Sequence, residues 1–143
     1  MEKQAVVQRR EVAYGILLGL IASVWLINGL FCKVLMMVPR HQEIVAGITG
    51  RLDAPSLTRF IGIGETLVAI WIVSGVWRRT AAIFQVVLII LMNIIEIIFV
   101  PDLLLWGRWN FLFAILLAAV ILYNEFVMRP DKTIIYPQSE AGK

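Results

Sequence analysis

Ionisable and amide side chains interrupt four long apolar stretches of the chain. They are Lys33 in the first stretch, Glu65 in the second, Glu96 in the third, and Arg108 with Asn110 in the fourth. A charge at the centre of a membrane helix costs roughly 2.5–3.5 kcal/mol on insertion scales, so such groups usually pair or carry function. Carboxylates beside cations can form salt bridges, relay protons or hydrogen-bond a ligand. We therefore expect either a binding or proton-handling site or an internal brace.

These side chains share one predicted depth. The connections at 78–80 and 101–103 are short, so the stretches that they join must be antiparallel neighbours. At a rise of 1.5 Å per residue, all of these groups then lie roughly 6–12 Å below the helix ends that face away from the termini. We predict a single polar layer in that half of the molecule.

In the second and third stretches the helical faces can be compared at 100° per residue. Gln85 and Glu96 share a face of the third stretch, with Asn93 on its flank, and Glu65 shares a face with the small residue Gly62. We expect both carboxylates to point inward, either as partners of a salt bridge or as ligand- or proton-handling groups. Asn93 and Gln85 are typical of interhelical hydrogen bonds.

In the first stretch Asn28 and Lys33 lie about 140° apart on an α-helix, so both cannot look straight into the core. The long side chain of Lys33 could instead extend its ammonium to the membrane interface. Trp25 lies mid-span on the face of Asn28, which makes it a candidate to line a pocket. Asn28 and Asn110 also suit interhelical hydrogen bonds. The other tryptophans lie near span ends and fit interfacial aromatic belts: Trp71, Trp77, Trp106 and Trp109.

The elements that must position these groups are membrane helices. The 143-residue chain is 60% hydrophobic, and one span needs about 20 apolar residues, so four spans nearly fill it. We predict an all-α, antiparallel four-helix membrane bundle in a domain over 1–126, followed by a polar tail over 127–143. The expected spans are 12–38, 57–77, 81–100 and 103–126. The first is too long for a signal peptide, so we expect it to be retained.

The longest loop, 40–58, is expected to hold a short interfacial helix. From His41 to Thr49, the apolar Ile44, Val45 and Ile48 are placed on one side and His41, Gln42 and Glu43 elsewhere, and Gly50 would end the helix. This places His41 on the surface of a loop.

Basic residues favour an orientation with both termini in the cytoplasm. The terminal side collects Lys3, Arg9, Arg10, Arg78, Arg79, Arg129, Lys132 and Lys143, against Arg40, Arg51, Arg59 and Arg108 on the other. Cytoplasmic loops are the richer in lysine and arginine, which indicates an inner-membrane protein of this topology. The same placement explains the net charge of +3 without nucleic acid, and the expected partner is the lipid bilayer.

The single cysteine, Cys32, and the single histidine, His41, exclude several chemistries. One cysteine cannot form an intramolecular disulfide or a dithiol redox pair. One histidine rules out bis-histidine haem ligation within one chain, and no metal site is expected. No cofactor is certain, and an organic one such as a quinone would be bound non-covalently.

Several segments together resemble the DoxX-like group of small bacterial membrane proteins. They are Asn28-Gly-Leu-Phe-Cys-Lys33, Pro39-Arg-His-Gln-Glu-Ile-Val45, Gly64-Glu65, Ser74-Gly75 and Met92-Asn93-Ile-Ile-Glu96, within about residues 12–125. The resemblance implies a four-helix membrane bundle and a link to redox systems, among them a membrane subunit of a thiosulfate:quinone oxidoreductase. The cysteine pair of the related vitamin K epoxide reductases is missing, so that chemistry does not carry over.

Three functions remain open from the sequence. The first is a non-autonomous membrane subunit that binds a quinone or other apolar ligand, with Lys33, Asn93, Asn110, Trp25 and a protonated Glu65 or Glu96 as hydrogen-bond donors. The second is a small oligomeric transporter or channel. The third is a non-catalytic assembly partner. Independent catalysis is not expected, and the partner would be a second copy of the chain or a soluble redox protein.

Overall fold

The described part of the chain contains four long helices, as the sequence predicts. The computed structural model describes residues 2–50, 53–107 and 109–130, with side chains from residue 4. The first long helix comprises α1 (Glu2–Leu26) and the π-helix η1 (Ile27–Val34), followed by α3 (Ala54–Ser74) and α4 (Arg78–Phe99). The fourth comprises α5 (Trp109–Tyr123) and the π-helix η3 (Asn124–Met128). All four are long and apolar enough to cross a membrane.

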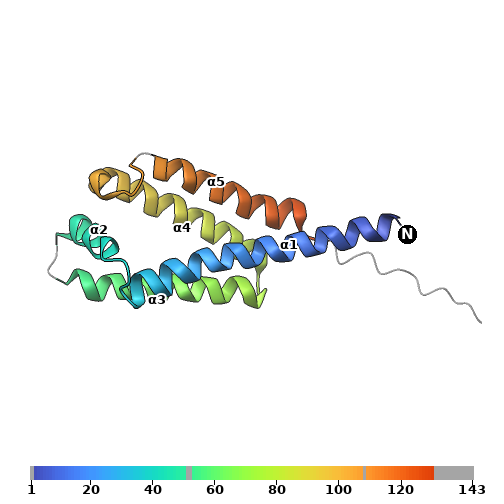
Figure 1. Ribbon diagram of the computed structural model, residues 1–143, viewed down its shortest axis with the longest axis horizontal. Coiled ribbons are helices and arrows are strands. Elements are labelled where there is room, and N and C mark those ends of the chain that lie inside the picture. Colours follow the sequence, from blue (N-terminus) through green and yellow to red (C-terminus); the bar gives the residue numbers. More distant parts are fainter. Residues whose placement is uncertain (1, 51–52, 108, 131–143) are drawn as a thin grey trace, which may run out of the picture.

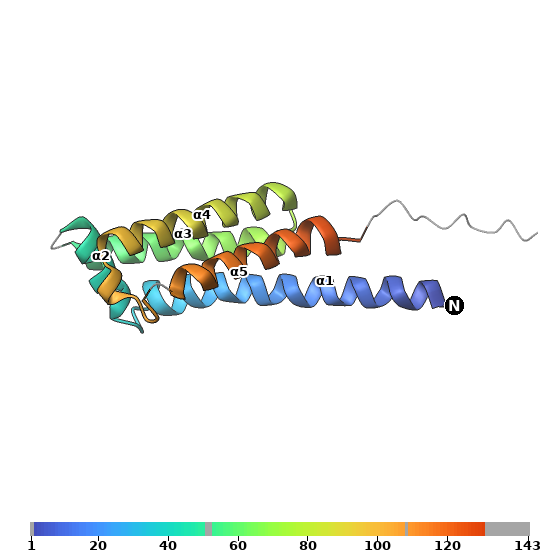
Figure 2. The same cartoon turned by 90° about the horizontal axis from the view of Figure 1, so that it is seen from above.

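The helices are arranged as an antiparallel four-cornered bundle. Figure 1 shows α4 and α5 on one side of the bundle and α1 and α3 on the other, whereas the perpendicular view in Figure 2 separates α3 and α4 from α1 and α5. Contacts run from α1 to α3, from α3 to α4 and from α4 to α5, while η3 returns to α1. Residues 2 and 130 therefore lie toward one end, the terminal end, and the short helix α2 (Arg40–Thr49) lies at the other, the α2 end.

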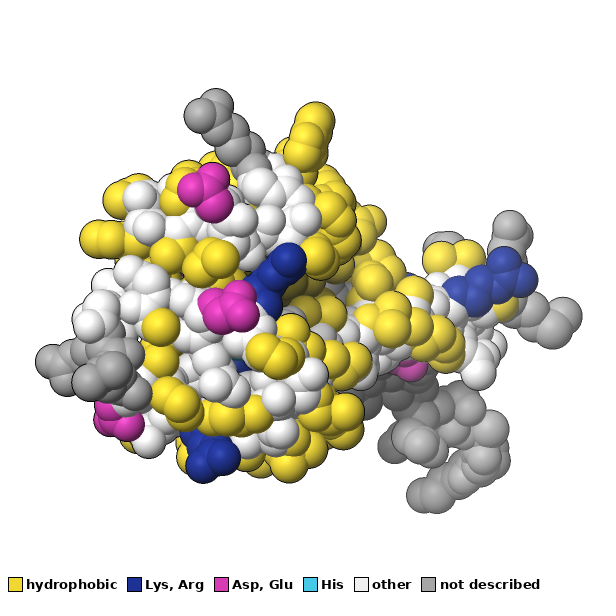
Figure 3. Space-filling view, turned by 60° about the vertical axis from the view of Figure 1, so that its left-hand side comes forward, with side chains coloured by type: hydrophobic (Ala, Val, Ile, Leu, Met, Phe, Trp, Pro, Cys, Tyr) yellow, Lys and Arg dark blue, Asp and Glu magenta, His cyan; other side chains and the backbone are white. Residues whose placement is uncertain are grey.

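Apolar side chains cover the outside of the bundle as well as its core. Leu20, Leu67, Val87 and Leu116, one from each long helix, are each more than half exposed. Such side chains would be unfavourable in water but suit lipid. Figure 3 turns the α2 end forward and shows charged side chains at the two ends, with hydrophobic ones on the flank between them.

The first long helix begins at Glu2, before the expected start of its span at residue 12, and two other helix boundaries fall well inside the expected spans. The first long helix ends at Val34 rather than Val38, because Leu35 closes it and Met36 has a positive φ of 54°. The fourth begins at Trp109, after the turn η2 (Pro101–Leu103) and Gly107 at φ 52°, rather than at Leu103. Both expected spans were based on apolar composition alone, so they included segments in which the backbone is no longer helical.

The expected loop helix is present as α2. Its cap, Gly50, has φ 60°, the left-handed conformation that glycine adopts without strain. Ile44 and Val45 are buried, and α2 packs against η1, α3 and α4. The helix therefore caps the bundle at this end.

Candidate binding site

The site begins with a close contact between two glycines. A Cβ on Gly29 would lie 2.7 Å from the carbonyl oxygen of Gly62, and one on Gly62 would lie 2.6 Å from that of Gly29. Only residues without a Cβ permit the two backbones to approach this closely. The contact brings the last turns of the first helix onto α3 and places Lys33 beside Glu65.

The π-helical winding of η1 changes which side chains of the first helix face inward. The amide of Leu35 donates to the carbonyl of Leu30 at 2.8 Å, the i to i+5 bond of a π-helix. Residues five apart lie much closer together around the axis of a π-helix than around that of an α-helix, and Asn28 and Lys33 line the same cavity. The expectation that they must diverge was wrong, because it assumed α-helical geometry throughout.

Lys33 and Glu65 form a buried salt bridge. Lys33 is 6% exposed and Glu65 4% exposed, and the ammonium donates to Oε1 of the carboxylate. The interpretation of Lys33 as a side chain that reaches the membrane interface is therefore wrong. Oε2 of Glu65 is also buried, and no described residue donates a hydrogen bond to it. A buried acceptor without a donor is costly and rare, so the ionised carboxylate depends on the salt bridge to Lys33.

A cavity of about 390 Å³ lies beside this pair. It brings together seven of the eight site residues predicted from the sequence, from all four long helices: Trp25, Asn28, Lys33, Glu65, Asn93, Glu96 and Asn110. Arg108, the eighth, lies outside the described residues. The other walls of the cavity are mostly apolar and include Ile89, Met92, Ala114 and Leu117. The polar residues that were predicted to share one layer thus line a cavity, and Glu65 and Glu96 are both on its walls.

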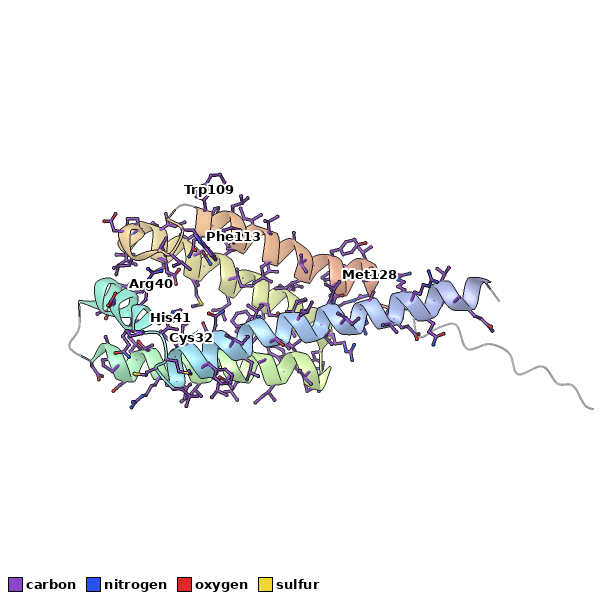
Figure 4. All side chains as sticks on the ribbon, viewed as in Figure 1. Cys32, Arg40, His41, Trp109, Phe113 and Met128 are labelled. Carbon is purple, nitrogen blue, oxygen red and sulfur yellow. The ribbon has the colours of Figure 1, made fainter. Side chains whose placement is uncertain are left out.

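The cavity meets the flank of the bundle between α1 and α5. Val24 and Phe113 line it from these two helices and are 38% and 48% exposed. Phe113 lies on α5 near the α2 end, whereas Trp109, one turn earlier, points outward (Figure 4). The seam closes toward the terminal end, where η3 packs on α1. An apolar molecule could therefore enter from the surrounding lipid.

Three amide or indole donors on the cavity wall are already engaged. Trp25 Nε1 donates to Gln85 Oε1 at 3.0 Å. Asn28 Nδ2 donates to the carbonyl of Val24 at 3.2 Å, and Asn93 Nδ2 donates to that of Ile89 at 2.9 Å. The two asparagines thus bond within their own helices, and the expectation of interhelical bonds was wrong for both. Gln85 does join two helices, as predicted.

His41 and Trp106 are cavity residues that the sequence reasoning placed elsewhere. His41 lies on the half-buried face of α2 and lines both this cavity and a smaller one of about 80 Å³ that also contacts Lys33 and Glu96. Burial, reinforced by the positive charges of Lys33 and Arg40, lowers the pKa of His41 to about 4. The imidazole is therefore neutral at pH 7. His41 lies three, four and seven residues before Ile44, Val45 and Ile48, and this spacing in the sequence is typical of residues on one face of an α-helix.

A second polar cluster at the terminal end was also missed. Arg78 donates to the hydroxyl of Tyr14 at 2.8 Å, and Tyr14 donates to Oε2 of Glu125 at 3.1 Å. Glu125 also accepts from Arg129 at 2.6 Å. Tyr14, Arg78 and Glu125 lie at corresponding span ends, so antiparallel connectivity would predict that they share one depth. The cluster ties the first, third and fourth long helices together.

Comparison with known proteins agrees with the architecture. Residues 22–123 match the DoxX-like family. The chain belongs to the DoxX-like family. No curated protein and no solved structure shows significant similarity to it. All residues that line the 390 Å³ cavity fall within the part matched to the DoxX-like family, whereas Tyr14, Glu125 and Arg129 of the terminal cluster fall outside it.

Proposed function

We propose that this membrane protein is a non-autonomous subunit that binds a quinone or a similar flat apolar molecule in the cavity at the α2 end. The observation that supports the proposal is the cavity itself, about 390 Å³ in volume, with the polar residues Asn110, His41, Glu65 and Glu96 on its wall. Ligand sites are typically clefts of 300–1,000 Å³ with apolar walls and a few converging polar groups. The volume and lining of this cavity fall in that class.

The surroundings of the cavity support a lipid-soluble ligand. Trp25, Trp106 and Phe113 supply aromatic surface on which a ring can stack. The seam between α1 and α5 offers an entry from the bilayer, where quinones dissolve. A ring placed among these side chains would have its polar atoms within reach of Asn110, His41 and the two carboxylates.

A subunit of this kind needs a partner to exchange electrons with the bound ligand. We expect that partner to be a soluble redox protein or a second copy of the chain. Isolation from native membranes in a mild detergent, followed by mass spectrometry of the intact complex, would identify it.

Extraction and binding measurements test the ligand. Purified protein should carry quinone in its organic extract, and a short-chain quinone should raise its melting temperature. An Ala114→Phe variant should lose both effects, because Ala114 is buried on the cavity wall. Ala119→Phe is the matched control, since Ala119 is exposed on the same helix. Absence of quinone from the extract, together with no thermal shift, would contradict the proposal.

A further inference from the structure

We infer that Glu96 exchanges protons with the solution at the α2 end through the smaller cavity of about 80 Å³, and that the terminal end is closed to this exchange. The inference adds proton exchange to the candidate site. Delivery of these protons to a quinone rests on the proposed function, whereas the exchange itself does not depend on the identity of the ligand.

Two cavities meet at Glu96. Its side chain lines both the 390 Å³ cavity and the smaller cavity, and so do Lys33, His41 and Met92. A carboxyl group in this position can take up a proton on one side and release it on the other. The rest of the smaller cavity is lined by apolar side chains of α2, α3 and α4: Ile44, Val45, Ile48, Ile61 and Ile95.

The smaller cavity has room and partners for water. Its volume of about 80 Å³ exceeds the roughly 10–15 Å³ that one water molecule requires, and a buried water usually has two to four polar partners. Lys33 keeps two N–H groups beyond the one donated to Glu65, and His41 and Glu96 add further polar atoms. Water here would connect Glu96 with the half-buried His41, and so with the solution around α2.

Glu96 can change its ionisation state without breaking a recorded contact. Glu65 is held by Lys33, and these two residues are also the charges that act on Glu96. On α2, His41 lies near Lys33 and is neutral at pH 7, and α5 contributes the uncharged Asn110. Within the described residues, no salt bridge or side-chain hydrogen bond involves Glu96. Its carboxyl group is therefore the one in the site that is suited to gain and lose a proton.

Packed side chains close the route to the terminal end. Ile21, Ile72, Ala82 and Ile121 belong to the buried apolar cluster of the core. The cavity that lies among these four side chains has a volume of about 20 Å³, which is room for about one water molecule. A continuous file of water cannot pass here, so protons should reach Glu96 from the α2 end alone.

The exchange would supply the protons that reduction of a bound quinone requires. Conversion of a quinone to a hydroquinone consumes two electrons and two protons, and the electrons would come from the expected redox partner. Glu96 would pass a proton from its carboxyl group to a quinone oxygen. The resulting carboxylate would then take the next proton from water in the smaller cavity.

Carbodiimide labelling tests the side from which protons arrive. Dicyclohexylcarbodiimide reacts with protonated carboxyl groups in membranes, and mass spectrometry locates the modified residue. The full-length protein is placed in uniformly oriented vesicles, in which the pH on each side is set separately. Raising the pH at the α2 end should lower the labelling of Glu96, by about tenfold per pH unit once the carboxyl group is mostly ionised. The same change at the terminal end should have no effect.

Two variants check that the label is on the intended residue. Glu96→Gln should abolish this labelling. Glu43→Gln is the matched control and should keep it, because Glu43 is exposed on α2 and lines neither cavity.

A rapid pH jump tests the route. Infrared absorption of the protonated carboxyl group follows Glu96 in time, and the Glu96→Gln variant identifies its band. Ile61→Phe fills the smaller cavity from α3 and should slow the response to a jump at the α2 end. Ile63→Phe is the matched control, since Ile63 is 49% exposed on the same helix, and it should respond as the native protein does. If Ile61→Phe does not fold, Ile48→Phe narrows the same cavity from α2.

The outcomes separate this inference from the proposed function. Labelling of Glu96 that is absent, independent of pH or governed by the pH at the terminal end would overturn the inference. A response of the cavity-filling variant as fast as that of the native protein would overturn the route through the smaller cavity. Absence of quinone binding in the extraction and melting measurements, with labelling of Glu96 governed by the α2 end, would contradict the proposed function alone.

Discussion

At the scale of single residues, the buried pair of Lys33 and Glu65 determines whether the α2 end of the bundle holds together. Removing one partner of a buried salt bridge leaves an uncompensated charge and typically costs about 3–5 kcal/mol. Lys33→Met should therefore lower the free energy of unfolding by about that amount, measured by denaturation in detergent micelles. A double variant, Lys33→Met with Glu65→Leu, removes both charges and should recover most of the loss. A single variant as stable as the native protein would show that the charges are not paired.

His41 gives the protein a pH dependence of a defined sign. Its pKa is about 4 in the folded protein and 6.5 when unperturbed, so the unfolded chain binds the proton first as the pH falls. The contribution of the neutral His41 imidazole to the free energy of unfolding is thus complete above pH 6.5 and is lost progressively between pH 6.5 and about 4. The melting temperature should fall over this window in the native protein and fall less in His41→Gln. Parallel pH profiles for the two proteins would exclude His41 as the cause.

At the scale of elements, the contact between η1 and α3 depends on glycine. A Cβ at position 62 would lie 2.7 Å from the Cβ of Lys33, so Gly62→Ala must push the two helices apart. Overpacking of this kind usually costs about 1–3 kcal/mol, and we expect that loss together with a disturbed Lys33–Glu65 pair. Thermal unfolding measures it. Gly64→Ala is the control on the same helix, because nothing lies within 4 Å of its Cβ and alanine favours helix.

The same elements explain which parts of the site could be predicted from the sequence. Apolar length located the four helices, and antiparallel connectivity gave Glu65 and Glu96 a common depth and a shared cavity. The π-helical turns of η1 could not be predicted from residue type, so the predicted orientation of Asn28 relative to Lys33 was wrong. The acceptor to which each N–H group donates, such as Gln85 for Trp25, depends on neighbours that only the fold brings together.

At the scale of the whole molecule, both termini should lie in the cytoplasm. The terminal end carries Arg9, Arg10, Arg78, Arg79 and Arg129, whereas Arg40 and Arg59 lie toward the α2 end. In a Cys32→Ser background, a cysteine at exposed position 43 should react with a membrane-impermeant maleimide in intact spheroplasts. A cysteine at exposed position 8 should react only after permeabilisation. The reverse pattern would place the cavity on the cytoplasmic side.

The packed middle of the bundle has an electrical consequence. Ile21, Trp25, Ile72 and Ile121 belong to one buried apolar cluster, which lies between the polar groups of the two ends. A medium of low polarity carries most of a voltage applied across it, so the membrane potential should fall chiefly over this layer. A charge gained or lost beside Glu65 from the α2 end would not cross this layer. Proton exchange from that end would therefore need less electrical work than proton transfer across the whole membrane.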